Sequence, residues 1–262
     1  MAGSPMKRRA FIGGALGAVV LSPLASAIGE DTHFRVAQLK HDGNWDTRPT
    51  AAGVLAQEVK FRTSVDVDLD RRVLTVSQDG LFRCPFLVML GDSRFRFDLA
   101  ERQRLRKWVE AGGFLVIDNS GRGEPSEAFD GSVRAELETM FPGRPLQKIP
   151  PQHVLFRTFY VLDFPAGRAI HRTFVEGLFL EERLAVVYSQ NDIFGAFDRD
   201  PLGSWTYDVT PGGETQRERA LRLGVNFVEY ALCLDYKDDQ AHTDYLLHQR
   251  RWQVTPPKIE TP

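Results

Sequence analysis

The segment Pro85–Arg94 constrains the fold more than any other part of the chain. It begins with an unbroken apolar run, Phe86–Leu90, and after a glycine it continues into Asp92, Ser93 and Arg94. A short apolar run that ends at a glycine and polar residues is typical of a buried strand in a parallel sheet. Such sheets bind ligands at the carboxyl ends of their strands. We therefore expect these three polar residues to lie at a ligand-binding edge.

The segments around this run alternate between patterns typical of strands and of helices. Strand patterns cover residues 34–39, 65–76, 86–90, 114–117 and 184–188, and helix patterns cover residues 49–62, 99–111, 132–141 and 215–234. That order predicts an α/β fold with a doubly wound, mostly parallel sheet, in one domain over residues 28–234. An insertion of about residues 145–180 is expected to hold loops and short strands, at 154–156 and 159–162. A polar tail follows over residues 235–262.

Local signals mark where the helices begin and end. Asp98, with Glu101 three residues later, predicts a capping box, and Leu99 is expected on the buried face of the same helix. Ser132 is expected to cap the next helix. Four basic residues of the first helix suit either a solvated face or a binding patch: Arg102, Arg104, Arg106 and Lys107.

The first 27 residues have the pattern of an export signal. Arg8 and Arg9 precede an apolar stretch over residues 10–24, and Ala25–Ala27 is a small-residue cleavage site. This pattern resembles a twin-arginine signal, which implies the twin-arginine export machinery as a partner. An ordinary secretory signal leads to the same compartment. We expect cleavage after Ala27 and a periplasmic or secreted mature protein.

Composition and motifs exclude several classes of function. Loss of the first 27 residues leaves 30 basic against 35 acidic residues, a formal net charge of −5, which argues against nucleic acid as a partner. No later apolar run is long enough to span a bilayer, so the mature chain is not expected to be an integral membrane protein. The sequence lacks CxxC, HExxH, P-loop and GxGxxG motifs, and we expect neither a cofactor nor a metal site. Cys84 and Cys233 can form a disulfide or remain thiols.

Four loops that follow expected strands are rich in polar residues, and they should meet at one edge of the sheet. Together with one histidine of the insertion, they supply the expected ligand-binding residues: Asn44, Trp45, Asp92, Arg94, Asp118, Asn119, His153, Asn191 and Asp192. Turns also favour aspartate and asparagine, so some of these residues can have a purely structural role. Trp45 in particular suits a stacking platform for a sugar or an aromatic lid over the core.

Catalysis at this edge has two candidate arrangements. Asp92 and Asp118 can form a carboxylate pair that divides into an acid and a base, unless each only braces its turn. Ser93 follows a strand as a nucleophile elbow does, but the second glycine of such an elbow is absent, and neither His153 nor His171 is tied to it. Outside these loops, Asn226 can reach the site or satisfy buried backbone groups.

Ordered motifs along the chain fit the pattern of one family. They are Phe34–Leu39 with Trp45, Pro85–Gly91, Leu105–Asp118, Met140–Pro142, Gln152–His153, Glu176–Gly177, Arg183–Asp192 and Leu223–Asn226. Together they resemble the bacterial domain-of-unknown-function family 4159, from about residue 34 to residue 234. That family is similar to class I glutamine amidotransferase-like domains, so the resemblance implies a flavodoxin-like sheet. It also implies a cell-envelope setting, beside MoxR-type ATPases and von Willebrand A-type proteins.

The resemblance does not carry catalysis over to this chain. An amidotransferase has a cysteine in its elbow, whereas here Asp92 and Ser93 follow the strand and Cys84 lies at its other end. The family pattern also has a histidine where this chain has Asp92. We expect an exported, non-catalytic domain that binds a small molecule or a protein in the cell envelope. The alternatives are a hydrolase of carbohydrates or amides that uses either the Asp92 and Asp118 pair or Ser93, and a scaffold for envelope assembly.

Overall fold

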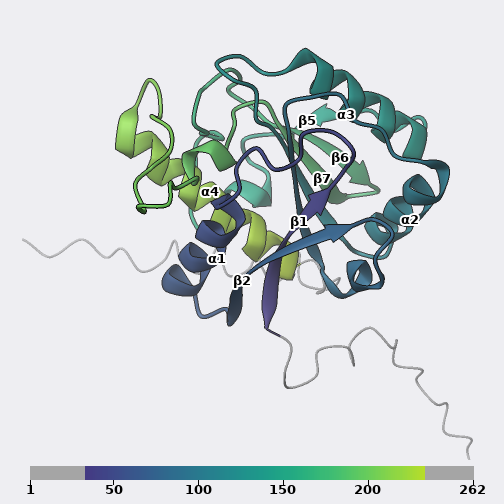
Figure 1. Cartoon of the computed structure of the whole chain (residues 1–262), viewed down its shortest axis with the longest axis horizontal. Helices are drawn as coiled ribbons and strands as arrows, with labels where there is room; N and C mark the ends of the chain where they lie inside the picture. The colour runs from purple at the N-terminus through teal and green to yellow at the C-terminus, as the bar shows by residue number, and fades with distance from the viewer. Residues whose placement is uncertain (1–32, 234–262) are drawn as a thin grey trace, which may run out of the picture. The chain divides into compact units, whose positions relative to one another are not determined.

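The computed structural model describes residues 33–233, which form one seven-stranded sheet covered by helices on both faces (Figure 1). The expected export signal with its cleavage site and the expected polar tail lie outside the described residues. The strands are β1 (Phe34–Lys40), β2 (Val67–Thr75), β3 (Phe86–Gly91), β4 (Phe114–Asn119), β5 (Gln147–Lys148), β6 (Glu176–Leu180) and β7 (Arg183–Ser189). The α-helices are α1 (Ala51–Arg62), α2 (Leu99–Glu110), α3 (Glu127–Met140) and α4 (Gly213–Cys233).

The order of the strands is that of a flavodoxin-like fold. The sheet runs β2-β1-β3-β4-β7-β6-β5, and the first five of these strands are parallel to one another. Only β6 reverses the direction, because it pairs antiparallel with both β7 and β5. The prediction of a doubly wound, mostly parallel sheet is therefore confirmed. The order reverses between β1 and β3, which is where folds of this type bind ligands.

Alternate side chains of the central strand β3 pack into the hydrophobic cores on the two faces of the sheet, as expected for a strand buried on both faces. Val88 and Leu90 belong to the core under α1 and α4, while Leu87 and Met89 belong to the core under α2 and α3. Figure 1 shows the two pairs of helices on opposite sides of the sheet. Cys84, just before β3, is buried as a free thiol.

The predicted capping box of α2 is confirmed. The Asp98 carboxylate accepts the Glu101 N–H at 2.8 Å, and the Glu101 carboxylate accepts the Asp98 N–H at 3.0 Å. Leu99 was expected to be buried, but it is 69% exposed, because it occupies the first position of the helix on its outer side. None of the described helices is long and apolar enough to cross a membrane.

The start of α3 was predicted wrongly. The helix begins at Glu127, and Ser126 is its cap, with the Ser126 hydroxyl accepting the Phe129 N–H at 3.3 Å. Ser132 lies inside the helix, where its hydroxyl accepts the Phe95 N–H at 3.2 Å. Both serines can cap a helix, and the local sequence does not show which of them faces the first turn.

The insertion contains two strands, β5 and β6, but at other positions than the two expected. Residues 154–156 form a 3₁₀-helix, and residues 159–162 have no regular structure. Their hydrogen-bond partner is the buried Asn226 of α4, whose Oδ1 accepts the Tyr160 N–H at 2.8 Å. The Nδ2 group of Asn226 donates to the carbonyls of Tyr160 and Leu155 at 2.9 and 3.0 Å. Asn226 therefore satisfies buried backbone groups of the insertion.

Candidate functional site

Side chains join the loops after β1 and β3, at the point where the strand order reverses. The Nδ2 group of Asn44 donates to Asp92 Oδ1 at 2.7 Å, and the Asn44 N–H donates to the Ser93 hydroxyl at 2.7 Å. Beside them, Asp42 Oδ1 accepts the Arg96 N–H at 2.8 Å. Asn44 is exposed, and both Asp92 and Ser93 are half-buried. The structure thus brings three predicted residues together on an accessible surface.

His41 forms the buried floor beneath these two loops. Its Nε2 lies 2.8 Å from the Leu90 carbonyl oxygen and its Nδ1 lies 3.1 Å from the Gly43 N–H. Those partners assign the proton to Nε2, because Nδ1 must accept a hydrogen bond. Burial lowers the pKa of His41. A neutral ring with both nitrogens bonded to backbone fixes the loop after β1 against β3. No sequence pattern distinguishes this histidine from the others.

An open hollow of about 440 Å³ lies beside the joined loops, over the start of α2. Asp42, Phe97 and Asp98 form part of its lining, together with Arg96 and the exposed Leu99. Among the described residues, the Arg96 side chain makes no hydrogen bond or ion pair. The exposed edge therefore offers a cation and an apolar contact side by side.

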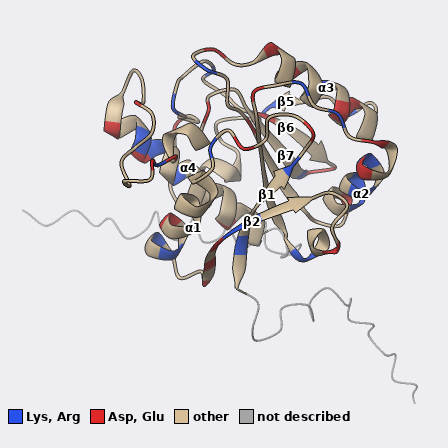
Figure 2. Cartoon of the chain, in the orientation of Figure 1, with Lys and Arg blue, Asp and Glu red and all other residues tan. Residues whose placement is uncertain are grey.

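Three of the four basic residues of α2 form ion pairs and the fourth, Lys107, is exposed, which agrees with the solvated face among the two interpretations of the sequence. Figure 2 shows basic and acidic positions interspersed along this helix. The ion pairs of the helix are Arg102 with Glu136 at 2.7 Å, Arg104 with Asp79 at 3.3 Å, and Arg106 with Glu110 at 2.8 Å.

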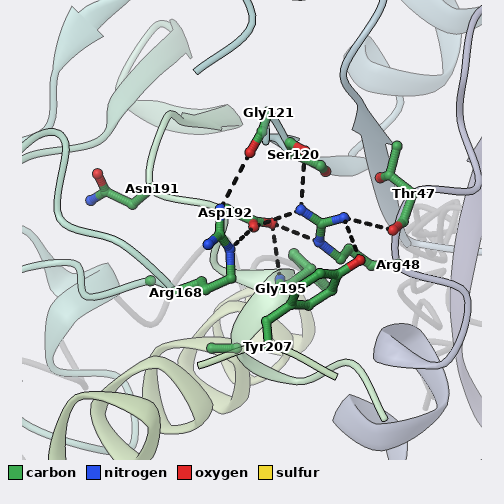
Figure 3. Close-up of polar contacts among 12 residues, drawn as sticks. Thr47, Arg48, Ser120, Gly121, Arg168, Asn191, Asp192, Gly195 and Tyr207 are labelled. Carbon is green, nitrogen blue, oxygen red and sulfur yellow. Dashed lines mark hydrogen bonds and ion pairs between the residues drawn. The ribbon is translucent and has the colours of Figure 1, made fainter. Parts of the chain in front are cut away.

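The loop after β7 carries a buried carboxylate that two arginines hold (Figure 3). Asp192 is 2% exposed and adopts a positive φ of 50°. Its Oδ2 accepts Arg48 Nη2 at 2.7 Å and also Arg168 Nε. Its Oδ1 accepts Arg48 Nε and the Gly195 N–H, each at 3.1 Å. The carboxylate is thus paired on every side, as a buried charge must be.

The two arginines join segments that are far apart in the sequence. Arg48 precedes α1 and also donates to the Ser120 carbonyl at 3.0 Å, whereas Arg168 comes from the insertion and donates to the Gly121 carbonyl at 3.3 Å. The ring of Tyr207 lies 4.4 Å from the Arg48 guanidinium carbon and 5.6 Å from that of Arg168. We call Arg48, Arg168, Asp192 and Tyr207 the arginine clamp. Three of them, Arg48, Arg168 and Tyr207, could not be predicted from the sequence, because a single arginine or tyrosine in a loop has no distinguishing pattern.

The carboxylate neighbour of Asp118 is Asp192 rather than the expected Asp92. Asp118 is fully buried, and its Oδ2 accepts the Phe194 N–H at 2.9 Å. Its Oδ1 has no hydrogen-bond partner within the described part of the chain. Burial, and then the charge of Asp192, raise the pKa of Asp118 to about 7. Asp118 faces the α1 and α4 layer, whereas Asp92 follows the end of β3 and bonds to Asn44 of the loop after β1.

Asn119 and Asn191 brace turns, as the structural alternative predicted. Asn119 Oδ1 accepts the Ser126 N–H at 2.8 Å, and its Nδ2 donates to the Ser126 carbonyl at 2.9 Å. Asn191 does the same for the insertion: its Oδ1 accepts the Arg172 N–H at 2.8 Å, and its Nδ2 donates to the carbonyls of Pro165 and Arg172. Both asparagines are buried.

The remaining predicted residues lie at other places. Arg94 is exposed in the loop after β3. Trp45 is half-buried near the basic side chains of Lys40 and Arg71, whose charged groups lie 5.5 and 5.6 Å from the ring. That position on the β2 side does not distinguish a stacking platform for a sugar from an aromatic lid over the core.

His153 does not join the other predicted residues. Its ring packs 5.8 Å from Phe179 and 5.9 Å from Tyr230. Phe179 pairs with Leu184 at the start of β7, so His153 lies toward the amino ends of the parallel strands. Burial lowers its pKa.

Within residues 33–233, no three His, Cys, Asp or Glu side chains gather in a way that would hold a metal ion.

Comparison with known proteins places the chain in a family of undetermined function. The comparison with curated proteins returned no match. A family model described as Domain of unknown function (DUF4159) matches residues 35–232, which is more than half of the chain. The chain belongs to the DUF4159 family.

Proposed function

We propose that this protein is an exported, non-catalytic domain that binds a ligand or partner in the bacterial cell envelope. The binding face would be the edge where the loops after β1 and β3 meet. The observation that carries this proposal is the hollow of about 440 Å³ that Asp42 of the β1 loop and Arg96 of the β3 loop help to line, because it opens at the point where the strand order reverses.

The bonding of the candidate catalytic groups supports binding over catalysis. The Ser93 hydroxyl accepts the Asn44 N–H, and in the part of the chain that the structure describes no histidine contacts it. Both ring nitrogens of His41 bond to backbone, and two arginines hold the Asp192 carboxylate. A nucleophile needs a base within hydrogen-bond reach, and none of these groups supplies one.

The hollow suits a ligand that carries an anionic group next to an apolar one. The Arg96 guanidinium can donate two parallel hydrogen bonds to a carboxylate or phosphate. Leu99, which is 69% exposed, can cover apolar surface of the same ligand. The acidic side chains of Asp42 and Asp98 are already bonded to backbone N–H groups in the same wall.

A thermal-shift screen of muropeptides, sugars and nucleotides with the full chain would test this proposal. We expect a compound that raises the melting temperature of the native protein but not that of Arg96→Ala. The Arg106→Ala variant is the matched control, because Arg106 is an exposed arginine of the neighbouring helix. Binding that survives both Arg96→Ala and Asp92→Asn would contradict the edge as the binding face.

The proposed export route has its own test. The Arg8→Lys and Arg9→Lys double variant should remain in the cytoplasm, since the twin-arginine route requires both residues. N-terminal sequencing of the mature protein should begin at Ile28. An exported double variant would identify an ordinary secretory signal, and a cytoplasmic native protein would overturn export altogether.

A hydrolase is the second candidate, because one observation favours it. A carboxyl group with a pKa near 7, such as Asp118, can act as a general acid at neutral pH. Its full burial is unfavourable, since an acid must reach the substrate. Turnover of a glycoside or amide that Asp118→Asn abolishes while the variant stays folded would replace the binding proposal with this one.

A further inference from the structure

The insertion contains a second hollow, away from the edge described above. It measures about 230 Å³ and is more enclosed than the hollow over α2. Prolines and phenylalanines provide much of its wall: Pro150, Pro151, Pro165, Phe156 and Phe174. An apolar, partly enclosed wall with few polar groups is the usual composition of a small-molecule site.

The wall of this hollow is fixed in place by groups outside it. Asn191 donates to the carbonyl of the lining residue Pro165 at 2.9 Å and to that of Arg172, next to the lining residue Thr173, at 2.7 Å. The N–H of the lining residue Ile149 bonds to the Val175 carbonyl at 3.0 Å. Proline rings restrict the backbone further. A site with so few degrees of freedom loses little entropy when it binds a ligand.

Two side chains of opposite charge line the same hollow. The Lys148 ammonium lies 4.2 Å from the centre of the Phe174 ring, so the wall itself holds it in position. Asp163 is exposed, and its carboxylate makes no hydrogen bond or ion pair with any residue that the structure describes. Lys148 likewise has no acidic partner among residues 33–233. Both charges remain available to a ligand.

We propose that this hollow binds a zwitterionic ligand, a free amino acid or a dipeptide, with its carboxylate toward Lys148 and its ammonium toward Asp163. The volume of about 230 Å³ has room for a small ligand of the size of an amino acid or dipeptide. The site shares no lining residue with the hollow over α2, so this proposal does not depend on the proposed function.

Titration calorimetry of the full chain with alanyl-alanine, in its L,L and D,D forms, tests the proposal. The N-acetylated and C-amidated forms of the same dipeptide remove one charge each. We expect the unmodified dipeptide to bind at least about fivefold more tightly than either blocked form, since each lost charge removes one charge-assisted contact.

Two variants assign each end of the ligand to its partner. Lys148→Met should bind the dipeptide and its C-amide equally, and Asp163→Asn should bind the dipeptide and its N-acetyl form equally. Both positions lie at the rim, so folding should not change. Lys107→Met and Glu182→Gln are the matched controls, because both are exposed charges outside the hollow.

Several results would overturn the proposal. No binding of any form at millimolar concentration would do so, and so would binding whose preference for free ends survives both variants. An apolar compound that binds in place of the dipeptide, with no effect of Lys148→Met or Asp163→Asn, would also exclude a zwitterion site. Arg96→Ala should leave dipeptide binding unchanged, and this keeps the outcome separate from that of the edge proposal.

Discussion

The loops after β1 and β3 and the loops after β4 and β7 end at the same edge of the sheet, and both pairs carry aspartate and asparagine. In the first pair, which we call the exposed half of the edge, side chains bond to one another at an accessible surface, with Asp92 and Asn44 as an example. In the second pair, which we call the buried half, they are buried, and Asp192 lies in the arginine clamp. The difference arises from the insertion, which covers β4 and β7 and supplies Arg168. A polar loop at a sheet edge is therefore available for ligands only where no other segment covers it.

The largest expected effect separates the two aspartates. Asp192→Asn keeps the shape of the side chain and tolerates the positive φ, but it leaves Arg48 and Arg168 buried without a counter-charge. We expect it to lower the free energy of unfolding by about 3–5 kcal/mol. Asp92→Asn is the matched variant on the exposed half and should change it by less than about 1 kcal/mol. Urea denaturation measures both, and similar losses would remove the distinction between the halves.

A smaller effect is expected at a glycine that touches the clamp. A Cβ atom at Gly195 would lie 2.3 Å from Asp192 Oδ2, and the two arginines prevent that carboxylate from moving away. Gly195→Ala should therefore cost about 1–3 kcal/mol. Gly131→Ala in α3 is the control, because a Cβ atom there meets nothing within 4 Å. That variant should stabilise the protein by about 0.5–1 kcal/mol, and a neutral Gly195→Ala would show that the clamp is loose.

The pH dependence of stability tests the pair of buried carboxyls. Asp118 has a pKa of about 7 when folded against an ordinary value of 3.8, so the folded state keeps a proton that the unfolded state releases. Its contribution should fall as the pH rises from 4 to 7, by up to about 1.4 kcal/mol per pH unit, and then level off. Asp118→Asn should remove this slope. The difference between the two proteins isolates Asp118, because both share His41 and His153, whose pKa values burial lowers.

The smallest effect is expected at the exposed bridge between the β1 and β3 loops. Asn44→Ala removes one hydrogen bond to Asp92 but keeps the backbone bond to Ser93, so its cost should stay below about 1 kcal/mol. Asn191→Ala removes four hydrogen bonds from a buried site and should cost more than twice as much. If thermal denaturation shows equal losses, the exposed half is as structural as the buried one.

The central strands of the sheet can be predicted from the sequence, because the signal for each is one continuous apolar run of neighbouring residues. Phe86–Leu90 and Leu184–Tyr188 can be recognised from a single apolar run each, and Asp98 with Glu101 forms a capping box across three residues. The location of the edge follows from those strands. The start of α3 does not, because Ser126 and Ser132 are both suitable caps and only the packing distinguishes them.

The division of the edge could not be predicted, because it depends on contacts between distant residues. Arg48 and Asp192 are 144 positions apart, and the insertion reaches its partners Asn191 and Asn226 through side chain–backbone bonds without a periodic signal. The neighbours that the structure gives the two aspartates, Asp192 for Asp118 and Asn44 for Asp92, could not be predicted for the same reason. Adjacent strands bring their ends together, but the direction of each side chain depends on what covers it.

Amide hydrogen exchange of the native protein tests the division of the edge most directly. The N–H groups of Phe194 and Gly195 donate to buried carboxylates, so we predict that they exchange only with opening close to global unfolding. The N–H groups of Asn44 and Arg96 donate to the half-buried Ser93 and the exposed Asp42 and should exchange through local opening, orders of magnitude faster. Equal protection of the two pairs would contradict the account, since both halves of the edge would then be equally structural.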